Sequence, residues 1–285
     1  MHVWRYQRHL MNSQTTNVFN KALLKDLSLD LSSAINPVKF AQSLGIEPDP
    51  WQRDVVLSTS NRIIMLCCRQ SGKSLTAALL ALWTALYNDN QLILLLSPSL
   101  RQSGELFRSK VLELYKTLQD NNTLPVIATS QTALSLSLSN GSRIVSLPDS
   151  EGTIRGYSGV NLLIADEAAR ISEGLYLAVR PMLAVSQGRL VLLSTPAGRR
   201  GFFWSAYTQG GETWERYTVK ATECQRITPQ FLTEERLALG ERFFAQEYEC
   251  SFEENEASYF TYDEIQGACS DEFKPLFALD GSLNV

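Results

Sequence analysis

Histidine is almost absent from this chain. Of 285 residues only His2 and His9 are histidine, and both lie in a polar N-terminal stretch. Catalysis by a serine–histidine–aspartate triad needs histidine as its general base, and many zinc sites use histidine ligands. The sequence therefore argues against both kinds of site.

Other features are scarce as well. The five cysteines form no C-x-x-C pair, so we expect reduced thiols, most of them buried. No apolar run reaches the roughly 18 residues that suggest a membrane span, and the N-terminus lacks the apolar core of a signal peptide. We therefore expect a cytoplasmic protein. A net charge of −4 gives no argument from composition for nucleic-acid binding.

A Gly-Lys-Ser turn lies between a predicted strand, residues 62–68, and a predicted helix, residues 75–87. This arrangement predicts a phosphate-binding loop, because backbone N–H groups and the helix N-terminus then point at one anion. We expect Lys73 to reach the β- and γ-phosphates of ATP and Ser74 to ligate Mg²⁺. Cys67 stands where the usual pattern has its first glycine, and a surface turn is the alternative. The predicted nucleotide-binding loop comprises Arg69, Gln70, Ser71, Gly72, Lys73 and Ser74.

A second apolar strand, residues 160–165, ends in Asp166 and Glu167. In open α/β sheets, ligands bind at the carboxyl ends of strands. We expect Asp166 to hold Mg²⁺ through its water shell and Glu167 to polarise the attacking water. The alternative is an acidic strand end that caps the following helix.

Two further segments carry candidate nucleotide contacts. Gln52 lies 20 residues before Gly72, and its amide can both donate to and accept from an adenine edge. Ser194 and Thr195 follow the apolar strand 189–193, where their hydroxyls can bond the γ-phosphate. An exposed helix residue and a plain turn are the respective alternatives.

The order of the elements predicts an α/β fold with a mostly parallel central sheet. Strand 91–97 is followed by a helix within 99–118, which makes a βαβ unit with the phosphate-loop strand, and residues 133–147 alternate as a β-hairpin. We divide the chain into a polar leader (1–36), a P-loop core (37–222) and a small helical linker or lid subdomain (223–285).

Taken together, residues 37 to 262 resemble the ATPase half of tailed-phage large terminase subunits. The resemblance implies a P-loop ATPase of the additional-strand (RecA-like) type that uses ATP and Mg²⁺ to drive double-stranded DNA into a procapsid. It also implies a portal protein and a small terminase subunit as partners, and a ring of copies on the portal. The resembling segments are Pro50-Trp51-Gln52 (adenine motif), Arg69 to Ser74 (Walker A), Leu162 to Ala168 (Walker B), Ser194 to Gly198 (coupling motif) and Phe244 to Tyr248 (linker signature).

The resemblance adds residue roles and one expected absence. Trp51 joins Gln52 in the adenine motif. Arg155 matches an arginine finger donated to a neighbouring subunit, and Arg69 is the rival in cis; a surface arginine is the plainer alternative for Arg155. Large terminases of this kind also carry an RNase H-like nuclease domain, which we expect to be absent from this chain, with no nuclease activity. A helicase-like ATPase and a low-turnover module that docks a portal or small terminase remain alternatives.

Overall fold

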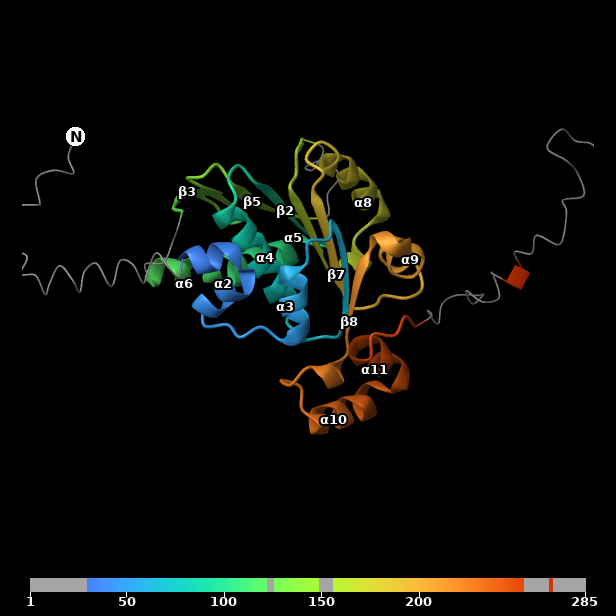
Figure 1. Cartoon of the computed structure of the whole chain (residues 1–285). Coiled ribbons are helices and arrows are strands. Elements are labelled where there is room, and N and C mark those ends of the chain that lie inside the picture. The colour runs from blue at the N-terminus through green and yellow to red at the C-terminus, as the bar shows by residue number, and fades with distance from the viewer. Residues whose placement is uncertain (1–29, 122–125, 149–155, 254–266, 269–285) are drawn as a thin grey trace, which may run out of the picture.

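Eight strands form one sheet in the part of the chain that the computed structural model describes, which is residues 30–121, 126–148, 156–253 and 267–268 (Figure 1). Strands β5, β2, β6, β7, β1 and β8 run parallel, and β3 and β4 are antiparallel additions at one edge. The order across the sheet is β3 (Ala128–Gln131), β4 (Ser135–Leu138), β5 (Arg143–Pro148), β2 (Leu92–Ser97), β6 (Leu162–Asp166), β7 (Arg189–Ser194), β1 (Arg62–Cys67) and β8 (Glu215–Val219). The predicted mostly parallel sheet and the hairpin are thus confirmed.

The central strands are continuous apolar runs because helices cover both faces of the sheet. All five residues of β6 are buried, and so are five of the six in β2. Alternating burial, which marks a sheet with one wet face, occurs in β4 instead. Parallel strands of this kind end at one edge, so their carboxyl ends bring distant parts of the chain together.

Two groups of helices flank the sheet, as Figure 1 shows. One face carries α2 (Pro37–Ser43), α3 (Pro50–Leu57), α4 (Lys73–Tyr87), α5 (Leu100–Leu106), a π-helical segment (Phe107–Leu112) and α6 (Glu113–Asp120). The other carries α8 (Glu173–Val179) and α9 (Gly201–Gln209), and 3₁₀ turns span Ala168–Arg170, Arg180–Leu183, Gly211–Thr213 and Ala221–Glu223. None of the helices within the described residues is both long and apolar enough to cross a lipid bilayer.

Helices α10 (Pro229–Leu239) and α11 (Glu241–Tyr248) follow β8 and lie beside that end of the sheet (Figure 1). Gly240 joins them at φ +76°, a conformation that favours glycine. Phe231 and Phe244 both pack against Tyr248, with ring centroids 6.1 and 5.2 Å away. We call residues 223–253, the continuous described stretch of the predicted subdomain, the lid.

Two smaller expectations meet the structure here. The cysteines Cys67, Cys68, Cys224 and Cys250 are free and buried, as expected for these four. The last part of the predicted leader, residues 30–36, packs on the core: Ser33 is buried, and Trp83 Nε1 donates to its carbonyl at 2.9 Å. The division into leader, core and subdomain stays a prediction.

Candidate nucleotide site

The predicted phosphate loop joins β1 to α4. Gln70 at φ +59° and Gly72 at φ +96° turn the chain through left-handed conformations, and α4 begins directly afterwards at Lys73. Cys67 is the last residue of β1 and pairs with Val219 of β8 in the extended conformation of a strand. The position therefore has no need of a glycine, and burial raises the pKa of its thiol.

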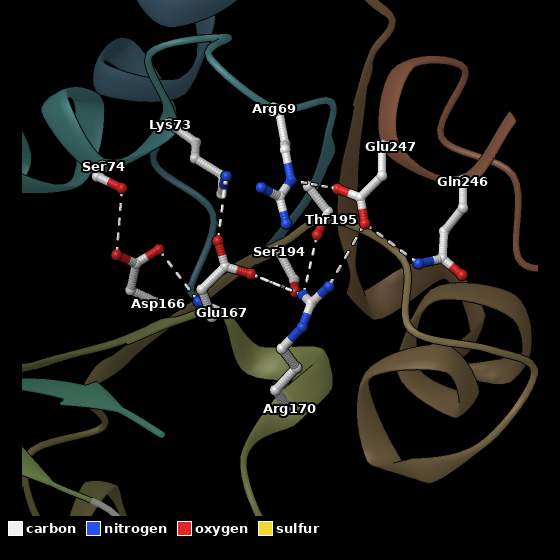
Figure 2. A network of polar contacts seen from close by, with 10 residues as sticks. All are labelled: Arg69, Lys73, Ser74, Asp166, Glu167, Arg170, Ser194, Thr195, Gln246 and Glu247. Atoms are coloured by element: carbon white, nitrogen blue, oxygen red, sulfur yellow. Dashed lines mark hydrogen bonds and ion pairs between the residues drawn. The ribbon is translucent and has the colours of Figure 1, made fainter. Parts of the chain in front are cut away.

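The structure brings the loop to the acids that end β6, 92 residues along the chain (Figure 2). Ser74 Oγ donates to Asp166 Oδ2 at 3.1 Å. Lys73 Nζ lies 3.2 Å from Glu167 Oε1. The two predicted halves of the site thus meet at the carboxyl ends of strands.

Burial and charge set the ionisation of this cluster. Burial raises the pKa of Asp166 to about 6, Glu167 adds to the effect, and Lys73 together with the Ser74 hydroxyl opposes it. For Lys73, burial lowers the pKa, but Glu167 and Asp166 outweigh it, so that the pKa rises and the ammonium stays charged. Because two carboxylates share this buried cluster with one ammonium, the binding of a further cation beside them is electrostatically favourable.

Magnesium fits the donor set present. The Ser74 hydroxyl and the Asp166 carboxylate are hard oxygen ligands, already within hydrogen-bond distance of one another. Within the described residues, no group of three or more His, Cys, Asp or Glu side chains gathers as a metal site. Mg²⁺ commonly takes one or two protein ligands and completes its shell with phosphates and water.

Glu167 adopts a backbone conformation that is uncommon for its type, φ +52° and ψ +42°. Conformations of this kind cost free energy and cluster at functional sites. Its carboxylate is held from two sides, by Lys73 at Oε1 and by Arg170, which donates from Nη1 to Oε2 at 2.8 Å. Ser194 Oγ lies 3.5 Å from the same Oε2.

The hydroxyls of Ser194, the last residue of β7, and of Thr195, which follows it, are buried beside this carboxylate. Ser194 is 0% and Thr195 2% exposed. Thr195 Oγ1 accepts a hydrogen bond from Arg170 Nη1 at 2.9 Å. The predicted contact of both hydroxyls with a γ-phosphate stays a prediction, but they lie next to the residue that we expect to act on it.

The lid reaches the phosphate loop through Glu247 of α11 (Figure 2). Arg69 Nε donates to Glu247 Oε2 at 2.5 Å, and the Arg69 amide donates to the Glu247 carbonyl at 3.0 Å. Arg170 Nη2 lies 3.8 Å from Glu247 Oε1. Arg69 is therefore bound to the lid in this structure, with 62% of its side chain exposed.

Gln52 supports the phosphate loop from behind. It is 3% exposed, its Nε2 donates to Thr76 Oγ1 at 2.9 Å and to the Gly72 carbonyl at 3.3 Å, and its Oε1 accepts from the Asp49 amide at 2.9 Å. The neighbouring Trp51 Nε1 is buried and has no hydrogen-bond partner within the described residues. Contact of Trp51 and Gln52 with adenine stays a prediction.

A cavity of about 740 Å³ lies between the phosphate loop and the lid, within the usual size of small-molecule sites. Lys73 and Ser74 open into it from one side, and Phe231 and Tyr248 from the other. The lining comprises Gln70, Gly72, Lys73, Ser74, Leu75, Lys110, Arg226, Ile227, Thr228, Phe231 and Tyr248. Neither Trp51 nor Gln52 belongs to this lining.

Sequence reasoning missed several residues of the site. Arg226 of the lid binds both carboxylate oxygens of Asp49, at 3.1 and 2.7 Å, and donates to the Ser71 carbonyl at 2.8 Å. Lys110 reaches the cavity from the π-helical segment. Arg170 follows the recognised Walker B segment, and Glu247 lies within the recognised linker signature, but the sequence indicated no contact between either residue and the rest of the site. Arg155 lies outside the described residues.

The family described as terminase large subunit, T4likevirus-type, N-terminal, matches residues 64–267, which is most of the chain. The chain belongs to this family. The large terminase subunits of Thermus phage G20c and of Thermus virus P23-45 are each 24% identical to it over 255 residues, covering 78% of this chain and 52% of theirs. This terminase chain thus spans about half the length of the curated relatives it matches.

Solved structures of large terminases share the fold of this terminase chain. The large terminase ATPase domain of Thermus phage P74-26 superposes with a TM-score of 0.66 at 22% identity, covering 75% of this chain and 98% of that domain. The large terminase of another thermophilic bacteriophage, in complex with ADP, gives 0.60 at 15% identity, covering 72% and 53%. The predicted RecA-like, additional-strand P-loop fold is confirmed.

Proposed function

We propose that this terminase chain hydrolyses ATP with Mg²⁺ and that the energy drives double-stranded DNA into a viral procapsid. One observation carries the proposal: Lys73 and Ser74 of the phosphate loop meet Asp166 and Glu167 at neighbouring strand ends. An ammonium, a hydroxyl and two carboxylates in this arrangement are the parts that phosphoryl transfer to water requires. The structures of similar terminases with ADP and with ATP-γ-S support the choice of nucleotide.

The side chains divide the chemistry between them. Lys73 binds phosphate oxygens, and in doing so it gives up its contact with Glu167 Oε1. Glu167 then orients the attacking water and takes up its proton. Ser74 and Asp166 hold Mg²⁺, which neutralises charge on the phosphates. Ser194 and Thr195, beside Glu167, bond the γ-phosphate.

The partners follow from family membership and are part of the proposal. The chain acts as a ring of copies on a portal protein, receives DNA with a small terminase subunit, and contacts DNA through backbone phosphates. Such contacts do not depend on sequence and weaken as salt rises. Arg155 is the finger that each copy gives to its neighbour, with Arg69 as the rival in cis.

Phosphate release by the full chain, measured over a range of protein concentrations, tests the function. We expect Lys73→Ala and Glu167→Gln each to lower turnover by about 10²-fold or more, because each removes a group that acts in the transition state. Lys116→Ala and Glu113→Gln, exposed residues of α6, are the matched controls and should hydrolyse ATP like the wild type. Unchanged turnover in Lys73→Ala or Glu167→Gln would remove the mechanism.

The concentration dependence tests the ring. If an arginine comes from a neighbouring subunit, activity per chain rises steeply as copies associate, because such fingers contribute about 10³- to 10⁵-fold in kcat. Activity per chain that stays constant from dilute to concentrated protein would contradict donation between subunits, although it would leave the chemistry at Lys73 and Glu167 intact.

A further inference from the structure

Arg170 contacts three parts of the site at once (Figure 2). Its Nη1 donates to Glu167 Oε2 at 2.8 Å and to Thr195 Oγ1 at 2.9 Å, and its Nη2 lies 3.8 Å from Glu247 Oε1. The guanidinium therefore connects the acid after β6, the hydroxyl after β7 and helix α11 of the lid. Arginine suits this place because its planar fork can serve several acceptors in fixed directions.

The backbone fixes Arg170 relative to Glu167. The two residues are the ends of one tight turn, in which the Arg170 amide donates to the Glu167 carbonyl at 2.9 Å. Glu167 enters this turn at φ +52°, and the turn Ala168–Arg170 is a single 3₁₀ helix. This short turn of fixed backbone conformation therefore holds the Arg170 guanidinium opposite the Glu167 carboxylate.

The two oxygens of Glu167 have different partners. Oε1 faces Lys73 at 3.2 Å, and Oε2 accepts from Arg170 at 2.8 Å. When the ammonium of Lys73 turns to phosphate, as the proposed function requires, Oε1 is released while Oε2 stays held. The carboxylate then has one oxygen free to accept a hydrogen bond from water and one oxygen that fixes its orientation.

We propose that Arg170 is a positioning residue that orients the carboxylate of Glu167 for attack by water and couples it to the lid through Glu247. The inference rests on the proposed ATPase function. It assigns Arg170 no contact with the nucleotide, only control of the group that acts on water. Loss of this control lowers kcat and leaves nucleotide binding largely intact.

The contact between Arg170 and Glu247 of the lid is weaker than the contact between Arg170 and Glu167. At 3.8 Å, Arg170 Nη2 and Glu247 Oε1 form an ion pair without a direct hydrogen bond. Glu247 is nonetheless well enclosed, with 13% of its side chain exposed, and its other oxygen accepts from Arg69. A charge placed between two arginines responds when either of them moves, so a shift of Arg170 changes how firmly α11 is held.

Steady-state kinetics and nucleotide-binding measurements on the full chain test whether Arg170 positions Glu167. For Arg170→Ala we expect kcat to fall by about 10²-fold, since small misplacements of a catalytic group cost rates of that order, while the Kd for an ATP analogue with Mg²⁺ changes little. Arg170→Lys should recover part of the rate, and added guanidinium should restore activity to Arg170→Ala. Arg216→Ala is the control; it removes an arginine that bonds two backbone carbonyls of α9 and the carbonyl of Trp214.

Two further measurements separate positioning from a structural role. Glu167→Gln combined with Arg170→Ala should be no slower than Glu167→Gln alone, because Arg170 acts through that carboxylate. Amide hydrogen exchange of residues 241–248 should be faster in Arg170→Ala than in Arg216→Ala. Unchanged exchange there would overturn the coupling to the lid.

The outcomes keep this inference and the proposed function apart. If the wild type does not hydrolyse ATP at any concentration, the proposed function fails. If the wild type is active and Arg170→Ala keeps its kcat, the positioning role is wrong. A fall in kcat together with an equal loss of affinity, without rescue by guanidinium, also overturns it. Should Arg170→Ala fail to fold, Arg170→Lys and Arg170→Gln carry the same comparison.

Discussion

Gly72→Ala tests how closely the phosphate loop is packed against its support. Gly72 has φ +96°, and a Cβ there would lie 2.9 Å from Gln52 Nε2 and 3.3 Å from an Arg226 terminal nitrogen. A Cβ atom essentially never comes within 3.0 Å of another side-chain atom, so the Gln52 amide would have to move in this variant. Gln52 is buried, and its Nε2 bonds Thr76 Oγ1 and the Gly72 carbonyl.

Two costs add in this variant. A left-handed conformation costs an L-residue about 1–2 kcal/mol. Leaving a buried amide without its partners costs about 1–3 kcal/mol more. The structure offers a control for the first cost alone: Gly45 has φ +75°, and a Cβ there meets nothing within 4 Å. Gly72→Ala should therefore lower the free energy of unfolding by about 2–5 kcal/mol and Gly45→Ala by about 1–2.

Urea denaturation of both variants and the wild type measures the difference in their free energies of unfolding. Both substitutions are Gly→Ala, so their effects on the entropy of the unfolded chain are the same and cancel in the comparison. Gly72→Ala should also weaken nucleotide binding, whereas Gly45→Ala should leave it alone. If the two variants lose the same stability to within about 0.5 kcal/mol, the packing of Gln52 against the loop contributes nothing, and the reasoning is wrong.

Two further predictions follow from other contacts of the site. Asp166→Asn should raise the free energy of unfolding by about 1–3 kcal/mol at neutral pH without Mg²⁺, because it removes a buried carboxylate whose pKa is raised to about 6. The same variant should lose Mg²⁺-dependent nucleotide binding. A variant less stable than the wild type would contradict the prediction. Arg226→Ala should change the free energy of unfolding by less than about 1 kcal/mol, because half of the Arg226 side chain is exposed where it pairs with Asp49. It should weaken nucleotide binding several-fold in a fluorescence titration, because Arg226 lines the cavity, and unchanged affinity would contradict a role there.

The parts of the site that the sequence predicts are those with local signals. The loop from Arg69 to Ser74 can be predicted because strand, turn and helix follow one another directly in the sequence. Asp166 can be predicted because it ends an apolar run. That these two segments meet also follows from a parallel sheet, in which strands end at one edge. The order of the strands is not local, however: β1 lies between β7 and β8, both from the far half of the chain.

The contacts between lid and core could not be predicted. Arg226 meets Asp49 across 177 residues, and Arg69 meets Glu247 across 178. Arginines and glutamates of this kind look like solvated surface in a sequence, since nothing in their neighbourhood specifies a partner. Gln52 shows the converse, because its spacing from Gly72 suggested a base contact, while its amide in the structure bonds the loop itself.

The charges at the site imply that nucleotide binding rearranges it. One connected network within the described residues joins Lys73, Arg170 and Arg69 to Glu167 and Glu247, with Asp166 beside it. Arg226, paired with Asp49, and Lys110 also line the cavity. A triphosphate would add several negative charges here, and in the proposed function it draws cations away from the acids that hold them. Under the proposed function, Lys73 leaves Glu167 for phosphate oxygens, and Mg²⁺ beside Asp166 would supply further positive charge. The exchange at Lys73 alters the contacts of Glu167, which Arg170 connects to Glu247 of the lid. Under the proposed function, ATP binding thus reaches the lid through Arg170, the same side chain that we propose orients Glu167 for water.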